Sequence, residues 1–142
     1  MIYIGIDPGT DTGLAVWDGD RFTAVEAIPI HAALLRVKEL AAFYGHRGNG
    51  VTVYFEDARL RKWYGTHTAK EDRARLQGAG SVKRDSKIWE DALTEWGIHF
   101  ETIAPKNNWT KMTANMFEAL TGWQGRTNEH SRDAAMLVFG RQ

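Results

Sequence analysis

The first eighteen residues constrain the fold of this chain more than any other segment. The alternating run at residues 2–6 predicts a strand that carries Asp7 at its end. Residues 8–10 predict a turn, and a second apolar strand follows at residues 13–18. A hairpin with an acid at its turn is suited to hold a metal ion or a phosphate, and we expect the glycines beside Asp7 to keep that turn tight. Which of the two it holds depends on whether the rest of the chain supplies further acids.

Bulk composition places the chain among ordinary globular proteins. It has 142 residues, of which 43% are apolar and 25% are charged, so we expect one domain over residues 1–142. No apolar run approaches the ~20 residues that span a bilayer, and no basic leader precedes the first strand. The absence of cysteine excludes disulfides and thiolate metal sites. We therefore expect a cytoplasmic protein without a membrane partner.

The charges are unevenly distributed although they sum to zero, with 18 basic and 18 acidic residues. Residues 59–87 contain nine lysines and arginines against three acids, which gives +6 for this segment and −6 for the remainder. A basic segment in an otherwise acidic chain can present one positive face to a polyanion such as nucleic acid. On charge alone, a solvated loop with internal salt bridges is an equal alternative.

Turn residues and hydrophobic periodicity divide the chain into strands and helices. Residues 57–79 lack a clear period and predict a long excursion of the kind that is usually functional or mobile. Three antiparallel strands followed by βα units predict an α/β fold of the ribonuclease H-like class, with a mixed five-stranded sheet flanked by helices. The expected strands are 2–7, 13–18, 21–28, 51–55 and 98–103, and the expected helices are 31–44, 80–96, 109–121 and one capped by Thr127 or Asn128.

Three acids occupy positions that can converge on a common ion. Asp7 and Glu56 each end a strand, and Asp133 lies one turn inside the last helix. His130 lies three residues before Asp133, so both project from one helical face, and Glu129 shares that side. Each acid alone is also typical of a turn, a strand end or an exposed helix, and a lone histidine is more often a surface or cap residue. Their joint placement favours a functional site.

Oxygen ligands accompanied by a histidine, without cysteine, suit Mg²⁺ or Mn²⁺ better than zinc. Two such ions roughly 3.5–4 Å apart can activate a water and stabilise the leaving oxygen of a phosphodiester. The protein then needs no covalent nucleophile, only closely spaced anionic ligands whose repulsion the cations relieve. The constellation therefore predicts two Mg²⁺ or Mn²⁺ ions in one active site.

Four segments of the chain resemble motifs of the RuvC-type Holliday junction resolvases. Residues 5–16 are similar to the first motif of that family, and residues 53–56 resemble its second acidic strand end. Residues 77–82 are similar to the segment that opens its central helix. Residues 130–135 resemble its C-terminal helix motif, in the form found in phage-encoded and related small resolvases. The resemblance runs from end to end of the chain.

This resemblance implies a homodimeric, metal-dependent endodeoxyribonuclease of DNA recombination and repair. Such an enzyme resolves four-way junctions by paired nicking through a metal-activated water. By position, Asp7, Glu56 and Asp133 would be metal ligands. Where the family usually has a further acid, this chain has His130, so two roles stay open for it, as a metal ligand or as a residue that assists the attacking water.

The resemblance also implies a DNA-contacting surface. Lys111 stands where the family often has a basic residue near the scissile phosphate, and Lys106 is the other candidate for that charge. Trp63 or Tyr64 can stack on an unpaired base at the junction centre, although packing beneath the loop is an equal alternative. The remaining DNA-binding candidates are basic residues of the middle segment: Arg59, Arg61, Lys62, Lys83 and Arg84.

Three alternatives stand beside the resolvase interpretation. One is a nuclease of the same fold from the YqgF group, which acts on ribosomal RNA precursors and has a similar opening motif. Another is a nucleotide-binding protein of the actin and sugar-kinase type, but those folds use two domains around the nucleotide, so we expect no nucleotide cofactor here. The last is a junction-binding protein without catalysis, which metal-dependent nicking of a synthetic junction would distinguish.

Overall fold

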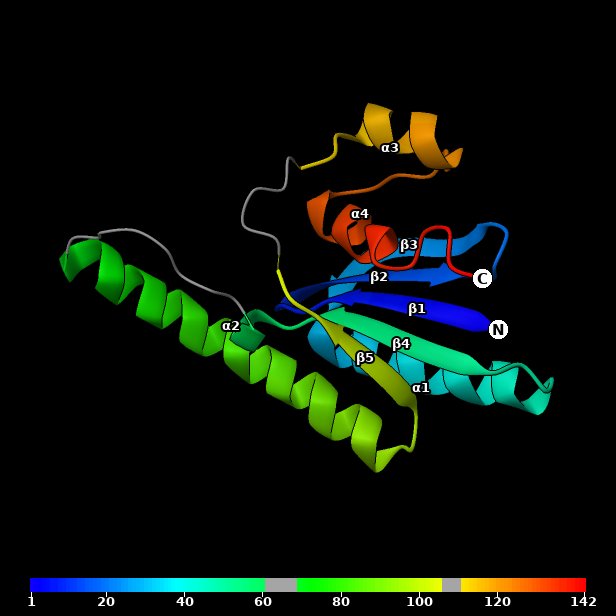
Figure 1. Cartoon of the computed structure of the whole chain (residues 1–142), viewed down its shortest axis with the longest axis horizontal. Helices are drawn as coiled ribbons and strands as arrows, with labels where there is room; N and C mark the ends of the chain where they lie inside the picture. Colours follow the sequence, from blue (N-terminus) through cyan, green and yellow to red (C-terminus); the bar gives the residue numbers. More distant parts are fainter. Residues whose placement is uncertain (61–68, 106–110) are drawn as a thin grey trace.

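The computed structural model describes residues 1–60, 69–105 and 111–142, without the side chains of 69–79 and 82. Its centre is a five-stranded sheet with the strand order β3-β2-β1-β4-β5 (Figure 1). The strands are β1 (Ile2–Asp7), β2 (Asp11–Trp17), β3 (Phe22–Pro29), β4 (Val51–Glu56) and β5 (His99–Ile103). Strands β1, β2 and β3 are antiparallel neighbours, whereas β4 runs parallel to both β1 and β5. The predicted mixed five-stranded sheet, with three antiparallel strands followed by parallel ones, is confirmed.

The parallel register of β1 and β4 brings the first two predicted acids to one edge of the sheet. Ile6 is paired with Phe55, so Asp7 and Glu56 follow at the carboxyl ends of adjacent strands. Asp7 is also paired with Gly13 in the antiparallel direction. Asp7, at the end of the central strand β1, therefore lies between β2 and β4.

Within the described ranges, four α-helices and a short 3-10 helix accompany the sheet. They are α1 (Ile30–His46), α2 (Ala69–Glu95), α3 (Ala114–Thr121), α4 (Glu129–Met136) and η1 (Ala58–Leu60). The predicted helix at 31–44 corresponds to α1, and the last predicted helix to α4. The helix predicted at 109–121 is α3, which begins only at Ala114, and residues 106–110 lie outside the described part of the chain. Within the described residues, no helix has the length and apolar character that crossing a membrane would require.

The long helix α2 differs from the prediction. It starts at Ala69, eleven residues before the predicted start at residue 80, and its 27 residues make a rod about 40 Å long. Its amino-terminal part extends away from the sheet (Figure 1). The prediction failed because residues 69–79 contain helix-forming alanine, lysine, glutamate and arginine but few apolar residues, so they show no amphipathic period.

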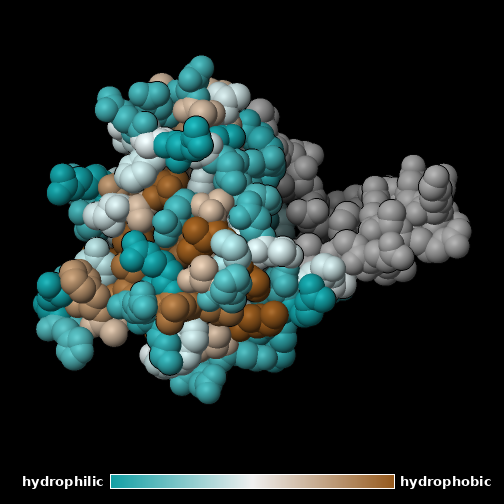
Figure 2. All heavy atoms as spheres, turned by 180° about the vertical axis from the view of Figure 1, so that it is seen from behind, coloured by the Kyte–Doolittle hydropathy of each residue, from teal (hydrophilic) through white to brown (hydrophobic). Residues whose placement is uncertain are grey.

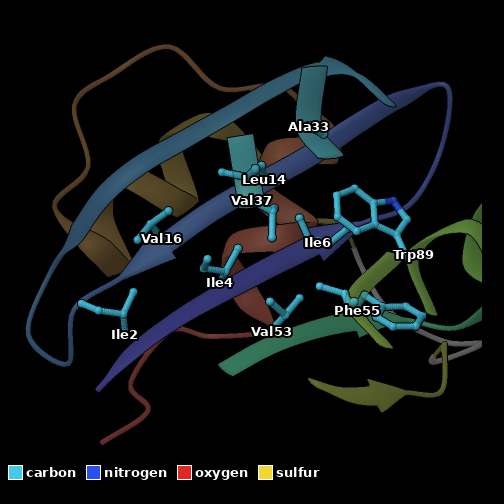
Figure 3. Close-up of a cluster of buried hydrophobic side chains, with 11 residues drawn as sticks. Ile2, Ile4, Ile6, Leu14, Val16, Ala33, Val37, Val53, Phe55 and Trp89 are labelled. Atoms are coloured by element: carbon cyan, nitrogen blue, oxygen red, sulfur yellow. The ribbon is translucent and has the colours of Figure 1, made fainter. Parts of the chain in front are cut away.

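The two faces of the sheet are covered by different helices. On one face, alternate strand residues such as Ile4, Ile6 and Phe55 pack against α1 and α2 (Figure 3). Trp89 of α2 is fully buried in this core. On the other face, Trp17, Phe22 and their neighbours pack against α3 and α4. Because side chains alternate between the faces of a strand, β1 contributes to both cores and ends between them at Asp7.

Candidate active site

Helix α4 lies unusually close to the sheet because two glycines leave room for its backbone. A Cβ added at Gly13 would come within 1.9 Å of the carbonyl oxygen of His130, and one at Gly5 within 2.1 Å of the carbonyl oxygen of Ala134. Neither glycine has a positive φ. Their function is therefore close approach, rather than the tight turn expected from the sequence. Any larger residue would push α4 away from Asp7.

The start of α4 is fixed by its cap. Asn128 accepts a hydrogen bond from the backbone N–H of Ser131, and the Ser131 hydroxyl accepts one from the backbone N–H of Asn128. This reciprocal capping box sets the rotation of the first turn. It directs the side chain of His130 toward β1, where the imidazole Nδ1 lies 3.0 Å from Oδ2 of Asp7.

Asp133 is held by a lysine that precedes α3. The ammonium of Lys111 donates to Oδ2 of Asp133 at 2.5 Å and lies 3.4 Å from Oε1 of Glu129. Glu129 and Asp133 are four residues apart and so share one face of α4. The side chains of Asp7 and Asp133 are only 16% and 19% exposed, whereas those of His130 and Lys111 are 49% and 56% exposed. Partly buried acids therefore face solvent-accessible basic groups.

The ionised form of the Asp7 carboxyl is disfavoured in this arrangement. Burial raises the pKa of the Asp7 carboxyl above its usual 3.8, and the negative charge of Asp133 adds to that rise. The hydrogen bond with His130 and the charge of Lys111 oppose it without cancelling it. At Lys111, burial acts to lower the pKa, but Asp133 and Glu129 outweigh burial and raise it above 10.5. The cluster thus favours additional positive charge beside its carboxylates.

Glu56 reaches the same edge of the sheet from β4 and is half-buried. These side chains nevertheless do not form a complete set of metal ligands. Among the described residues, no three His, Asp or Glu side chains come together closely enough to hold a metal ion. Asp7 and His130 form one pair and Asp133 belongs to a second, lysine-bound pair.

Arg59, a predicted DNA contact, lies in an ion-pair network just beyond Glu56. Its guanidinium contacts both carboxylate oxygens of Asp57, at 2.7–3.1 Å, and also Glu90 on α2. Asp57 is 3% exposed, and its backbone N–H donates to the carbonyl of Ile103 at 2.9 Å. The guanidinium holds the pKa of the Asp57 carboxyl below 3.8. Arg59 therefore links the end of β4 to α2.

The other predicted DNA contacts are divided between the described helix and segments outside the description. Lys83 and Arg84 are exposed on α2, where Arg84 lies 3.8 Å from Asp85. Arg61, Lys62, Trp63, Tyr64 and Lys106 lie outside the described residues.

Sequence reasoning missed two contributors to this region. The sequence predicts that Glu129 shares a helical side with Asp133 but assigns it no partner, whereas in the structure it is the second partner of the Lys111 ammonium. The network of Asp57, Arg59 and Glu90 was also missed. The available signal was an acid directly after a strand with an arginine two residues later, but Glu90 is 31 residues away from Arg59 and no local pattern connects them.

Comparisons with known proteins assign no family to this chain. No protein-family model and no curated protein matches the sequence. A solved structure to which the chain is similar is described as the Thermus thermophilus RuvC structure, at 19% sequence identity and a TM-score of 0.48. The alignment covers 97% of this chain and 91% of that chain. At this level of similarity, activity and residue roles must be argued from the geometry of the chain itself.

Proposed function

We propose that this protein is a metal-dependent, structure-selective endodeoxyribonuclease that resolves four-way DNA junctions by paired nicking. The observation that carries the proposal is the convergence of Asp7, His130, Asp133 and Lys111 where β1 ends under α4. Those residues come from opposite ends of the sequence. Glu56 ends the adjacent parallel strand and supplies a further carboxylate to the same edge.

The donor chemistry of the site fits Mg²⁺ or Mn²⁺. Asp7, Glu56 and Asp133 offer carboxylate oxygens and His130 offers a nitrogen, which is a hard donor set. The raised pKa of Asp7, caused by burial and then by Asp133, indicates that a cation would relieve repulsion already present in the fold. We propose that these four residues hold the metal, with two ions in the complete site. A divalent cation bound there supplies Lewis-acid assistance to phosphodiester hydrolysis.

The chain's own residues have separate tasks in this proposal. When Nδ1 of His130 donates to Asp7, Nε2 keeps its lone pair and can accept a proton or bind a cation. The half-exposed ammonium of Lys111 can exchange a carboxylate for a phosphate oxygen of the substrate. Glu129 keeps that ammonium near Asp133 while the substrate is absent.

The partners follow from the same proposal. Branched DNA is the substrate, and the basic segment 59–87 supplies the positive field that attracts it. A four-way junction needs two cuts, so we propose a homodimer with one site per protomer. Lys83 and Arg84 are exposed on α2 and can contact the phosphate backbone.

Cleavage of a labelled synthetic four-way junction tests this function. We expect nicking with Mg²⁺ or Mn²⁺, none with EDTA, and a loss of at least about 10³-fold in Asp7→Asn with junction binding retained. Asp11→Asn is the matched control, because Asp11 is an exposed acid of the same hairpin. Linear, flap, fork and RNA substrates are run in parallel. Wild-type cutting in EDTA, equal cutting by Asp7→Asn, or preference for RNA would each contradict the proposal.

A further inference from the structure

A hollow of about 560 Å³ lies at the opposite end of the sheet from the candidate active site. It is bounded by the second half of α1, the start of β4 and the turn from α2 into β5. Its walls include Ala42, Val51 and Ile98, and Trp96 contributes an aromatic side chain. We call this hollow the α1–β5 groove. The view from behind shows hydrophobic residues exposed among hydrophilic ones (Figure 2).

The polar lining of the α1–β5 groove has one sign of charge. Lys38 and His99 line it, and no carboxylate does so within the described residues. The ammonium of Lys38 lies 5.5 Å from the centre of the Trp96 ring, in a cation–π contact. Within the groove, the Trp96 ring is thus accompanied by a cation.

From these contacts we propose that the α1–β5 groove is a docking site for an acidic protein segment with a large apolar side chain. The apolar side chain would fill the space between Val51, Ile98 and Trp96. A flanking carboxylate would meet the ammonium of Lys38 in a charge-assisted hydrogen bond. Burial of one large apolar side chain together with such an ion pair favours a weak, reversible contact.

A nucleic acid fits the same surface less well. Base stacking needs an open aromatic face, but Lys38 lies over Trp96, and the other apolar side chains of the lining are aliphatic. Backbone tracking needs a row of cations, whereas the lining has one permanent positive charge. The charge complementarity therefore favours an acidic, apolar protein segment.

The location leaves the catalytic edge free. β4 and β5 begin at the groove and end at the edge that carries Glu56, so roughly 15–20 Å of strand separate the two sites. A partner bound at the groove can hold the protein in place while DNA occupies the other end. This inference does not depend on the proposed nuclease activity.

Peptide display on the intact protein tests the proposal. Random peptides of about twelve residues are selected on wild type and counter-selected on Ala42→Trp, which fills the exposed mouth of the groove. Leu35→Trp adds the same ring elsewhere on α1, at a position that is 58% exposed, and is the matched control. Enriched peptides are then titrated against ¹⁵N-labelled protein, following the indole N–H signal of Trp96, which is assigned with Trp96→Phe.

We expect enriched peptides to be acidic and to carry at least one large apolar residue, and to shift the Trp96 signal. Lys38→Gln should weaken binding about tenfold, whereas Arg36→Gln on the same helix, outside the groove, should change it less than twofold. The proposal is overturned if no sequence is enriched on wild type over Ala42→Trp, if enriched sequences lack acidic residues, or if Leu35→Trp loses binding equally. It is also overturned if an oligothymidine of about ten nucleotides shifts the Trp96 signal and the peptides do not.

Discussion

Two ion-pair clusters lie near the ends of β1 and β4, and they differ in how fully their carboxylates are paired. In the cluster of Asp57, Arg59 and Glu90, the central carboxylate is 3% exposed and a guanidinium occupies both of its oxygens. In the cluster around Asp7, two partly buried acids are each contacted by one exposed basic side chain. In the first cluster both oxygens of the buried carboxylate are paired, so we call it closed. In the second, each acid is paired through one oxygen and lies beside an exposed basic group, so we call it open.

The difference separates a structural ion pair from a candidate catalytic one. The Arg59 guanidinium holds the pKa of Asp57 below its ordinary value, whereas burial holds the pKa of Asp7 above it. A carboxylate whose charge is fully compensated has nothing to gain from a metal. One whose charge is under-compensated can gain much. The four predictions that follow test this contrast.

The largest effect should come from breaking the closed cluster. Arg59→Met leaves the buried Asp57 carboxylate without its main partner, and removing one member of such a pair costs about 3–5 kcal/mol. We expect Tm to fall by roughly 10 °C in thermal unfolding followed by circular dichroism. Arg21→Met, which removes the exposed partner of Asp18, is the control and should leave Tm unchanged. A fall in Tm no larger than that of Arg21→Met would show that the closed cluster is not structural.

A second effect should separate the position of α4 from the charges on it. Gly13→Ala places a methyl group against the carbonyl of His130, and because both groups are backbone-fixed, relief requires α4 to move. We expect a loss of about 1–3 kcal/mol and a strong loss of junction cleavage, measured by denaturation and gel assay. Gly45→Ala on α1 has open space at its Cβ and should be neutral or slightly stabilising. Full activity in Gly13→Ala would mean that the contact of His130 with Asp7 is dispensable.

Much of this architecture could be predicted from the sequence. The alternation of Ile2, Ile4 and Ile6 marks a strand because one period-2 pattern decides both its type and its faces. The end of β4 and the cap at Asn128 carry equally local signals. These local patterns were sufficient to predict that Asp7, Glu56 and Asp133 lie near one edge of a mixed sheet.

What could not be predicted depends on contacts between distant residues. The requirement for Gly13 comes from the backbone of α4, more than a hundred residues away, and a glycine near a turn is interpreted first as a turn residue. The pairing of Arg59 with Glu90 has the same character, since a basic residue in a basic segment is interpreted as a nucleic-acid contact. Roles of single side chains are set by tertiary partners that no local pattern identifies.

A third prediction uses the opposite pKa shifts of the two aspartates. Because the pKa of Asp7 is raised on folding, its ionisation costs stability as pH rises from about the ordinary 3.8 through the raised value. Asp7→Asn removes that cost, so in EDTA at pH 7 its Tm should exceed that of wild type by about 3 °C, which corresponds to about 1 kcal/mol. This gain should shrink as pH falls below 3.8, the ordinary value.

Asp57→Asn supplies the comparison for the third prediction. Because the pKa of Asp57 is lowered on folding, its charge stabilises the protein above the ordinary 3.8, and that contribution is lost as pH falls through the lowered value. Asp57→Asn should therefore be less stable than wild type at pH 7, and the deficit should close in acid. If both variants changed stability in the same direction at pH 7, the contrast between an open and a closed cluster would be wrong.

The smallest effect concerns the cation that the open cluster already contains. Lys111 bridges Asp133 and Glu129, so its ammonium competes with a divalent ion for the Asp133 carboxylate. Lys111→Met removes this competitor, and we expect Mn²⁺ to bind about three- to fivefold more tightly, measured by titration calorimetry at low ionic strength. Lys83→Met is the control, because it removes an exposed lysine of α2 and should leave the Mn²⁺ affinity unchanged.

Cleavage should nevertheless fall in Lys111→Met, since the same ammonium is proposed to contact the substrate phosphate. Tighter Mn²⁺ binding together with slower cutting would distinguish a substrate-contacting lysine from one that only shields the acids, whereas an unchanged Mn²⁺ affinity would place the ion away from Asp133.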